Sequence, residues 1–155
     1  MDAIDRQILT VLQNDLDISI AELANQVGLT QTPAWKRVQK LEQAGVILKR
    51  VALVAPEKIG LGLTVFVQIV APDHSAEWLR NFAQTISDLP EVMEFYRMAG
   101  DIDYMLRVVV ADMAAYEAFY ENLIETIPLK TVTSRFTVER LKSTTAFTVS
   151  EPPQS

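Results

Sequence analysis

The stretch LANQVGLTQTPAWKRVQKLEQAGVI, Leu23 to Ile47, carries two short helical patterns separated by a glycine. A Ser-x-x-Glu capping box at Ser19 opens the first helix, and Gly28 ends it after two turns. Residues 3 to 14, upstream, place apolar side chains at helical spacing and form another amphipathic helix. Three short helices are therefore expected within the first 45 residues.

The third helix has its own start and stop signals. Thr32 followed by Pro33 predicts its beginning, with proline at the first helical position, where the missing N–H costs nothing. Gly45 supplies the left-handed residue that ends it. The buried stripe consists of Ala34, Val38 and Leu41. This stripe turns amides, hydroxyls and bases of the same helix outward.

A capped helix that follows a helix and a glycine turn, with polar and basic residues outward, is typical of a helix-turn-helix recognition helix. Its bases would meet phosphates, and its first residues would reach base edges. The competing interpretation is a solvated basic face, which the capping box and the turn disfavour. The extended segment VILKRVALVAP that follows suits a small strand or wing whose bases add backbone contacts. The predicted DNA-binding residues are Thr30, Gln31, Thr32, Lys36, Arg37, Lys40, Lys49 and Arg50.

The local charge of the third helix supports DNA binding there, although the net charge of the whole chain opposes it. The formal net charge is −6, which by itself argues against a nucleic-acid partner. Residues 30 to 50, however, contain five bases and one acid, a local charge of +4. If about five phosphates are neutralised per subunit, the log affinity of a dimer falls with log salt at a slope of about −9.

Composition excludes other classes of protein. The chain has no cysteine and one histidine, His74, which excludes disulfides, thiolate chemistry and a multi-histidine metal centre. No apolar run is long enough to span a bilayer, and the start, MDAIDRQ, is unlike a secretory signal. We therefore expect a cytoplasmic protein without cofactors.

Beyond residue 62 the pattern changes to strand, helix, strand, and then repeats. Strands are expected at residues 63–70, 92–98, 103–110 and 131–138, with helices capped by Ser75 and Asp112. This order predicts a ferredoxin-like βαββαβ domain, a four-stranded antiparallel sheet with both helices on one face. The fold class is therefore α+β, a winged helix-turn-helix followed by a ferredoxin-like domain.

We expect domain boundaries at residues 1–54 for the DNA-binding domain, 55–62 for a linker, 63–149 for the ferredoxin-like domain and 150–155 for a disordered tail. The strands offer apolar groups to both sides of the sheet. Val92 and Met98 should face one side, and Met93 and Phe95 the other. The apolar face without helices would then be covered by a second copy, which predicts a homodimer.

Two motifs in their expected order resemble the Lrp/AsnC family of feast/famine transcription regulators. The first is Leu23 to Ile47, and the second is GDIDYMLRV, similar to a glycine-aspartate-x-aspartate-tyrosine turn of the family's ligand domain. SRFTVERLKSTTA resembles the family's last strand and tail. Ile127-Pro128-Leu129 stands where the family commonly has a leucine-proline-glycine-valine turn, and it has one residue fewer. Ser134 fits the family's hydroxyl position best, with Thr133 as the alternative.

The resemblance implies an amino-acid effector near the turn at an interface between dimers, and assembly beyond the dimer to a tetramer or octamer. Asp101 or Asp103 could accept an ammonium group, and N–H groups around Gly100 could bind a carboxylate. By itself, glycine with aspartates is ordinary hairpin chemistry, and a metal site lacks enough oxygen ligands. The implied effector-binding residues are Met98, Gly100, Asp101, Asp103, Tyr104 and Ser134.

The predicted function is sequence-specific DNA binding by a transcription regulator, in which an amino acid or related metabolite shifts assembly or DNA affinity. One alternative is a small ferredoxin-like metabolite sensor or enzyme without DNA binding. No grouping of nucleophile, base and orienting residue supports an enzyme. A regulator without any effector is the other alternative.

Overall fold

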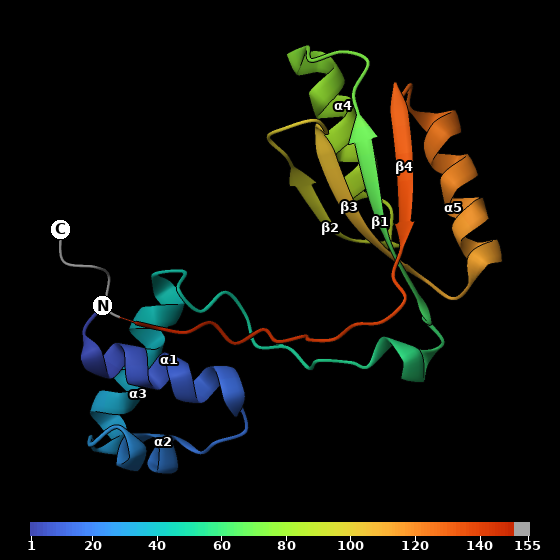
Figure 1. The fold of residues 1–155 in the computed structure, drawn as a ribbon. Coiled ribbons are helices and arrows are strands. Elements are labelled where there is room, and N and C mark those ends of the chain that lie inside the picture. Colours follow the sequence, from blue (N-terminus) through green and yellow to red (C-terminus); the bar gives the residue numbers. More distant parts are fainter. Residues whose placement is uncertain (151–155) are drawn as a thin grey trace. The chain divides into compact units, whose positions relative to one another are not determined.

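The computed structural model describes residues 1–150, which fold into two compact units (Figure 1). One, here called the helical unit, contains residues 1–53 and the C-terminal segment from residue 142. The other, the sheet unit, contains residues 54–141. Each unit has a hydrophobic core of its own.

Three helices form the helical unit: α1 (Ala3–Asn14), α2 (Ile20–Gln26) and α3 (Gln31–Gln43). The first two begin with reciprocal capping boxes, at Asp2 and at Ser19, and the second of these was expected from the Ser-x-x-Glu signal. The predicted stripe of α3 is buried and packs with the apolar faces of α1 and α2. The three predicted helices are confirmed.

Glycine closes both α2 and α3. Gly28 and Gly45 have φ angles of 70° and 68°, the left-handed region that favours glycine. After α2, the N–H of Leu29 donates to the Ala24 carbonyl at 2.8 Å, and after α3 the N–H of Val46 donates to the Leu41 carbonyl at 2.9 Å. These bonds satisfy carbonyls that a helix end leaves unpaired.

The start of α3 differs from expectation. Thr30, and not Thr32, is the N-cap residue, and Pro33 occupies the third helical position. The turn that follows α2 at Gly28 is short, so α3 already begins at Gln31. Proline at the third position is tolerated because the first four N–H groups of a helix have no intrahelical partner.

The segment after α3 also differs. Residues 46–56, expected as a small strand or wing, form no strand in this single chain. A strand requires a hydrogen-bonded neighbour, and within residues 1–150 no other segment pairs with this one. The expected linker, 55–62, contains a short 3-10 helix, Pro56–Ile59, which belongs to the sheet unit.

The sheet unit has the predicted βαββαβ order. Its elements are β1 (Leu63–Val70), α4 (Ala76–Ser87), β2 (Val92–Arg97), β3 (Tyr104–Val110), α5 (Met113–Thr126) and β4 (Thr131–Phe136). The strands lie in the order β2-β3-β1-β4, with every neighbouring pair antiparallel (Figure 1). Ser75 and Asp112 cap α4 and α5 through their side chains, as expected.

Buried and partly exposed side chains alternate along β1 and β3, so the buried ones lie on the one face of the sheet that both helices cover. Val65, Val67 and Ile69 of β1 are fully buried, and they pair with every second residue of β3. Phe82 of α4 and Phe119 of α5 pack into this single core. The ferredoxin-like fold is therefore confirmed.

The expected alternation of β2 is wrong because the strand contains an irregularity. Val92 pairs with Val108 and Glu94 with Arg107, so Met93 lies in a bulge between them. Val92 and Phe95 consequently pack against the same core. The open face of the sheet is also more polar than expected, since Arg107 and Glu94 form an ion pair on it at 2.8 Å.

The C-terminal segment, from residue 142, packs with the helical unit. Both backbone groups of Phe147 bond the side chain of Gln13, its N–H at 2.7 Å and its carbonyl at 3.2 Å. Val149 packs against the core of α1, α2 and α3. The expected tail lies, from residue 151 onward, outside the described residues.

Candidate functional site

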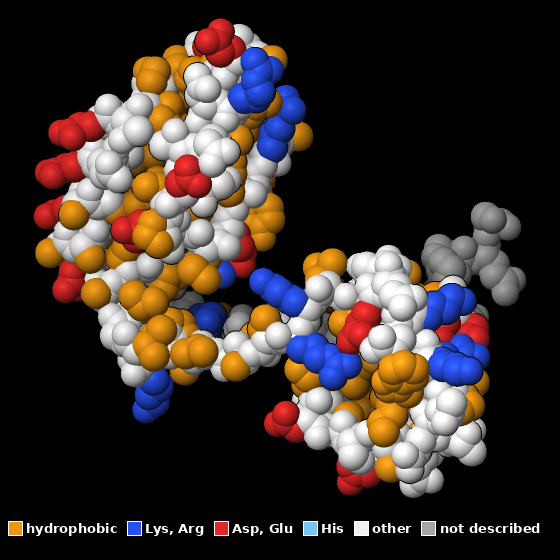
Figure 2. Space-filling view, turned by 180° about the vertical axis from the view of Figure 1, so that it is seen from behind, with side chains coloured by type: hydrophobic (Ala, Val, Ile, Leu, Met, Phe, Trp, Pro, Cys, Tyr) orange, Lys and Arg blue, Asp and Glu red, His pale blue; other side chains and the backbone are white. Residues whose placement is uncertain are grey.

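The DNA-binding candidates lie mainly on the outward face of α3. Gln31 and Thr32 in its first turn are exposed, as are Lys36 and Lys40 farther along. Neither lysine has an ion-pair partner within residues 1–150. Thr30 and Lys49 are also exposed. Figure 2 shows Lys and Arg side chains on the helical unit and carboxylates along one edge of the sheet unit.

Two of the predicted DNA contacts are already engaged within the chain. Arg50 donates to Glu42 through Nε at 3.2 Å and through Nη2 at 2.9 Å. Arg37 donates from Nη1 to Asp2 Oδ2 and to Asp5 Oδ1, both at 2.7 Å. The structure therefore separates the predicted bases into free lysines and paired arginines.

The electrostatics around Arg37 follow from these bonds. Hydrogen bonds from the Asp5 backbone and from Arg37 hold the pKa of Asp2 below its usual value. Burial raises the pKa of Asp5, but bonds from the Asp2 backbone and from Arg37 outweigh it, so the pKa is lowered. The same two carboxylates raise the pKa of Arg37. All three groups remain charged at neutral pH.

The sequence interpretation missed Asp2 and Asp5 as partners of Arg37. Their spacing of three residues at a helix start is that of a capping box, in which each carboxylate bonds the other residue's backbone N–H. Only the packing of α1 against α3 brings Arg37 to the remaining oxygens. That contact joins residues more than 30 positions apart.

The turn between β2 and β3 is a compact structure with one exposed carboxylate. Gly100 has a φ of 134°, and the N–H of Met98 donates to the Asp103 carbonyl at 2.8 Å. Asp103 Oδ2 accepts the N–H of Ala71 at 2.8 Å, so this carboxylate holds the chain where it leaves β1. Asp101 is exposed and has no side-chain partner within residues 1–150.

The structure brings Met98, Gly100, Asp101 and Asp103 together but not the other two effector candidates. Tyr104 is 4% exposed and lies among aromatic rings, with centroids 4.8 Å from Phe82 and 5.6 Å from Phe95. Ser134 lies on β4, separated from β3 by β1, and its hydroxyl bonds that of buried Tyr116. Within one chain, Tyr104 is therefore a core residue, and Ser134 is a partly exposed residue on another strand.

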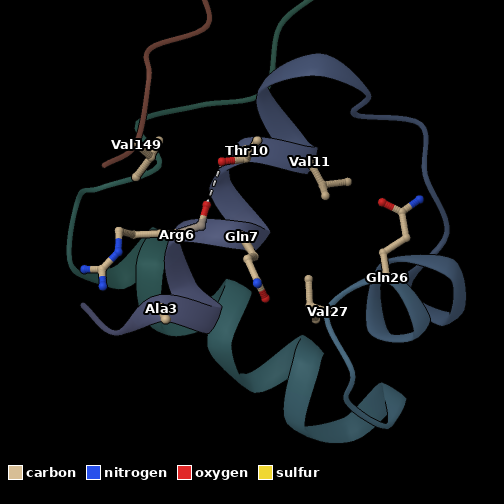
Figure 3. Close-up of a pocket in the computed structure, with 8 residues that line it drawn as sticks. All are labelled: Ala3, Arg6, Gln7, Thr10, Val11, Gln26, Val27 and Val149. Carbon is tan, nitrogen blue, oxygen red and sulfur yellow. Dashed lines mark hydrogen bonds between the residues drawn. The ribbon is translucent and has the colours of Figure 1, made fainter. Parts of the chain in front are cut away.

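A hollow of about 420 Å³ in the helical unit has no counterpart in the sequence predictions (Figure 3). It is lined by Ala3, Arg6, Gln7, Thr10, Val11, Gln26, Val27 and Val149. Val149 comes from the returning C-terminal segment, and the other residues come from α1 and the end of α2 (Figure 3). Its only ionisable side chain is Arg6, so it lacks the grouping that catalysis requires.

Among residues 1–150, no three His, Cys, Asp or Glu side chains gather closely enough to hold a metal ion. None of the helices in this range combines the length and apolar composition that a membrane crossing requires.

Two family models match the chain. Residues 1–42 match the AsnC-type helix-turn-helix domain. Residues 64–147 match the Lrp/AsnC ligand binding domain. The first match spans α1, α2 and all but the last residue of α3, and the second spans the sheet with both of its helices.

Whole-chain comparisons agree with the domain matches. The chain is 48% identical over 150 residues to the DNA-binding transcriptional activator DecR of Escherichia coli (strain K12), over 96% of this chain and 99% of that protein. It is similar to the crystal structure of an AsnC family transcriptional regulator from Agrobacterium tumefaciens, with a TM-score of 0.92, 52% identity, and 95% and 96% of the two chains covered. A transcriptional regulator from Neisseria meningitidis, solved in complex with L-Met, has a TM-score of 0.90 and 30% identity, with the same coverage.

Proposed function

The chain belongs to the Lrp/AsnC family of DNA-binding transcription regulators, and we propose that it binds duplex DNA by placing α3 in the major groove. The observation that carries this proposal is the outward face of α3. Gln31 and Thr32 lie at its start, where side chains reach base edges, and Lys36 and Lys40 follow without intramolecular partners. These lysines are available to phosphates.

The free bases set the expected salt dependence. Lys36, Lys40 and Lys49 are exposed and unpaired among the described residues, whereas Arg37 and Arg50 are in ion pairs. Six phosphate contacts in a dimer give a slope of log affinity against log salt of about −5, in place of the −9 expected when both arginines also contact phosphates.

The test measures binding to a mixed-sequence duplex by fluorescence anisotropy between about 50 and 300 mM salt. Replacing both Lys36 and Lys40 by alanine should flatten the slope by about 4 in a dimer. Replacing both Lys58 and Lys130 by alanine removes the same charge from exposed positions of the sheet unit, and this matched control should leave the slope unchanged. Full binding and an unaltered slope in the double variant would place DNA elsewhere on the protein.

We further propose that a small amino acid binds at the turn from Met98 to Asp103. The similar protein from Neisseria meningitidis was solved with L-Met, and this turn presents the chemistry that an amino acid requires. Asp101 offers a free carboxylate to an ammonium group. Asp103 contributes mainly by holding the turn, since its Oδ2 is bonded to Ala71.

Calorimetry with the twenty amino acids tests this site. Asp101→Asn removes the charge without breaking a bond inside the chain, so it should weaken the best ligand by about tenfold or more, as expected for loss of one charge-assisted bond. Glu117→Gln, an equal charge change at an exposed position of α5, should bind like the wild type. Absence of heat with every amino acid contradicts the effector proposal and leaves the DNA proposal standing.

We also propose that the open face of the sheet joins two copies into a dimer, and that other surfaces join dimers into a tetramer or octamer. Phe66, Met105 and Val109 lie on this face between polar residues. Met105→Glu should shift the protein toward monomer in analytical ultracentrifugation, whereas Met113→Glu on the exposed side of α5 should not. A wild-type assembly of the Met105 variant would assign the interface to another surface.

A further inference from the structure

Arg37 occupies the flank of α3 that faces α1, next to the buried stripe of Ala34, Val38 and Leu41. Its Nη1 donates one hydrogen bond to Asp2 and one to Asp5, each at 2.7 Å. The side chain is about one third exposed, so it lies at the edge of the interface between the two helices. This position differs from that of Lys36 and Lys40, which point outward.

The two aspartates leave no oxygen unused. Asp2 Oδ1 accepts the N–H of Asp5 at 2.9 Å, and Asp5 Oδ2 accepts the N–H of Asp2 at 3.0 Å. The remaining oxygen of each carboxylate accepts from Arg37. One guanidinium nitrogen therefore completes the capping box of α1 and attaches it to α3.

Burial makes this arrangement costly to break. Asp5 is 8% exposed and is the only charged residue counted as buried within residues 1–150. If Arg37 turned away to reach a phosphate, it would leave this carboxylate buried and without its cation, which is strongly unfavourable. A DNA phosphate would have to compete with two carboxylates that are already at hydrogen-bonding distance.

We infer that Arg37 is a positioning residue for DNA binding, which fixes the orientation of α3 on α1 and does not contact phosphate. The inference rests on the proposed function, in which α3 enters the groove. Apolar packing of Ile8 against Val38 and Leu41 is non-directional and specifies the rotation of a helix only weakly. Charge-assisted bonds at 2.7 Å are directional, and they add a second point of attachment at the start of α1.

The experiment compares variants on two duplexes, one selected from random sequence for tight binding and one unselected. Arg37→Ala should weaken binding to the selected duplex by about tenfold, because a misoriented α3 would lose about one base-edge contact made by its other side chains. It should leave the salt slope unchanged, because no phosphate contact is lost. Lys36→Ala is the matched control and should flatten the slope by about 2 in a dimer. A flattening by about 2 in Arg37→Ala would overturn the inference, because it marks a lost phosphate contact.

Asp2→Asn gives a second test, in which DNA affinity should change in opposite directions if Arg37 positions α3 and if it contacts DNA. This exposed position keeps the acceptor for the Asp5 N–H, so the protein should still fold if Arg37→Ala does not. Weaker binding to the selected duplex supports positioning, because the attachment of α3 is loosened. Tighter binding overturns it, because a released Arg37 would then be contacting DNA. Asp17→Asn makes the same charge change at an exposed site and measures the general electrostatic effect.

Failure of the proposed function would be visible separately. It appears as an unchanged slope in Lys36→Ala, whereas failure of the present inference appears in the slope of Arg37→Ala or in the sign of Asp2→Asn. Arg37→Lys adds a rescue measurement: a cation that restores the bridge to Asp2 and Asp5 should recover part of the affinity for the selected duplex and again leave the slope unchanged.

Discussion

Replacing Asp103 by alanine should destabilise the sheet unit, and the structure allows the size of the effect to be worked out. Asp103 joins two strands at the point where the chain leaves β1. Its N–H donates to the Ile69 carbonyl at 2.9 Å, and its Oδ2 accepts the N–H of Ala71 at 2.8 Å. Ala71 is 4% exposed, so water cannot readily replace a lost acceptor.

Alanine at position 103 removes only the side-chain bond. The N–H of Ala71 would then be buried without a partner, which costs about 1–3 kcal/mol of unfolding free energy. For a unit of this size, each kcal/mol corresponds to about 4–8 °C in Tm, so the melting temperature of the sheet unit should fall by about 4–24 °C. Asp103→Asn keeps an oxygen in place and should recover most of this loss.

Thermal unfolding followed by circular dichroism measures the effect. Asp101→Ala is the matched control, because Asp101 belongs to the same turn and its carboxylate is exposed and unpaired among the described residues. We expect Asp101→Ala to melt like the wild type. If Asp103→Ala and Asp101→Ala melted at the same temperature, the carboxylate of Asp103 would have no structural role, and the argument that it mainly holds the turn would fail.

Three further predictions concern the helical unit. Gly45→Ala should cost about 1 kcal/mol in urea unfolding, because φ is 68° there, and an unchanged midpoint would contradict the role of the left-handed turn. The pKa values of Asp2 and Asp5 are lowered on folding, so their contribution is present above the ordinary carboxyl pKa and is lost as pH falls through the lowered values. Acid unfolding followed at 222 nm should therefore depend less steeply on pH below about pH 4 in Asp2→Asn than in the wild type. Deleting residues 142–155 should speed hydrogen exchange in α1, because Val149 no longer covers the core, and wild-type exchange rates would show that the returning segment adds nothing to stability.

Local signals in the sequence were sufficient for most of the helices and strands, but not for the start of α3 or for the segment after it. The limits of α1 and β1 follow from apolar spacing and caps, because these depend on residues within a few positions of one another. The order of elements then restricts the second domain to one topology. The exposed lysines of α3 were likewise predictable, since its buried stripe determines what faces outward.

Departures from the predictions arose where residues distant in the chain meet. The free charge assigned to Arg37 depended on whether any carboxylate would pack beside it, and α1 supplies two. The hydroxyl of Ser134, a predicted effector residue, bonds that of Tyr116 on α5, a contact that the local sequence does not record. Asp103 is bonded to the end of another strand, which no local pattern records.

The sequence by itself determined the elements, the order of the two units and the residues that could carry charge to a polyanion. Tertiary structure alone decided which of those residues are free. Secondary structure follows from short-range backbone and side-chain preferences, whereas the availability of a charged group depends on every group that folding brings within hydrogen-bonding distance of it.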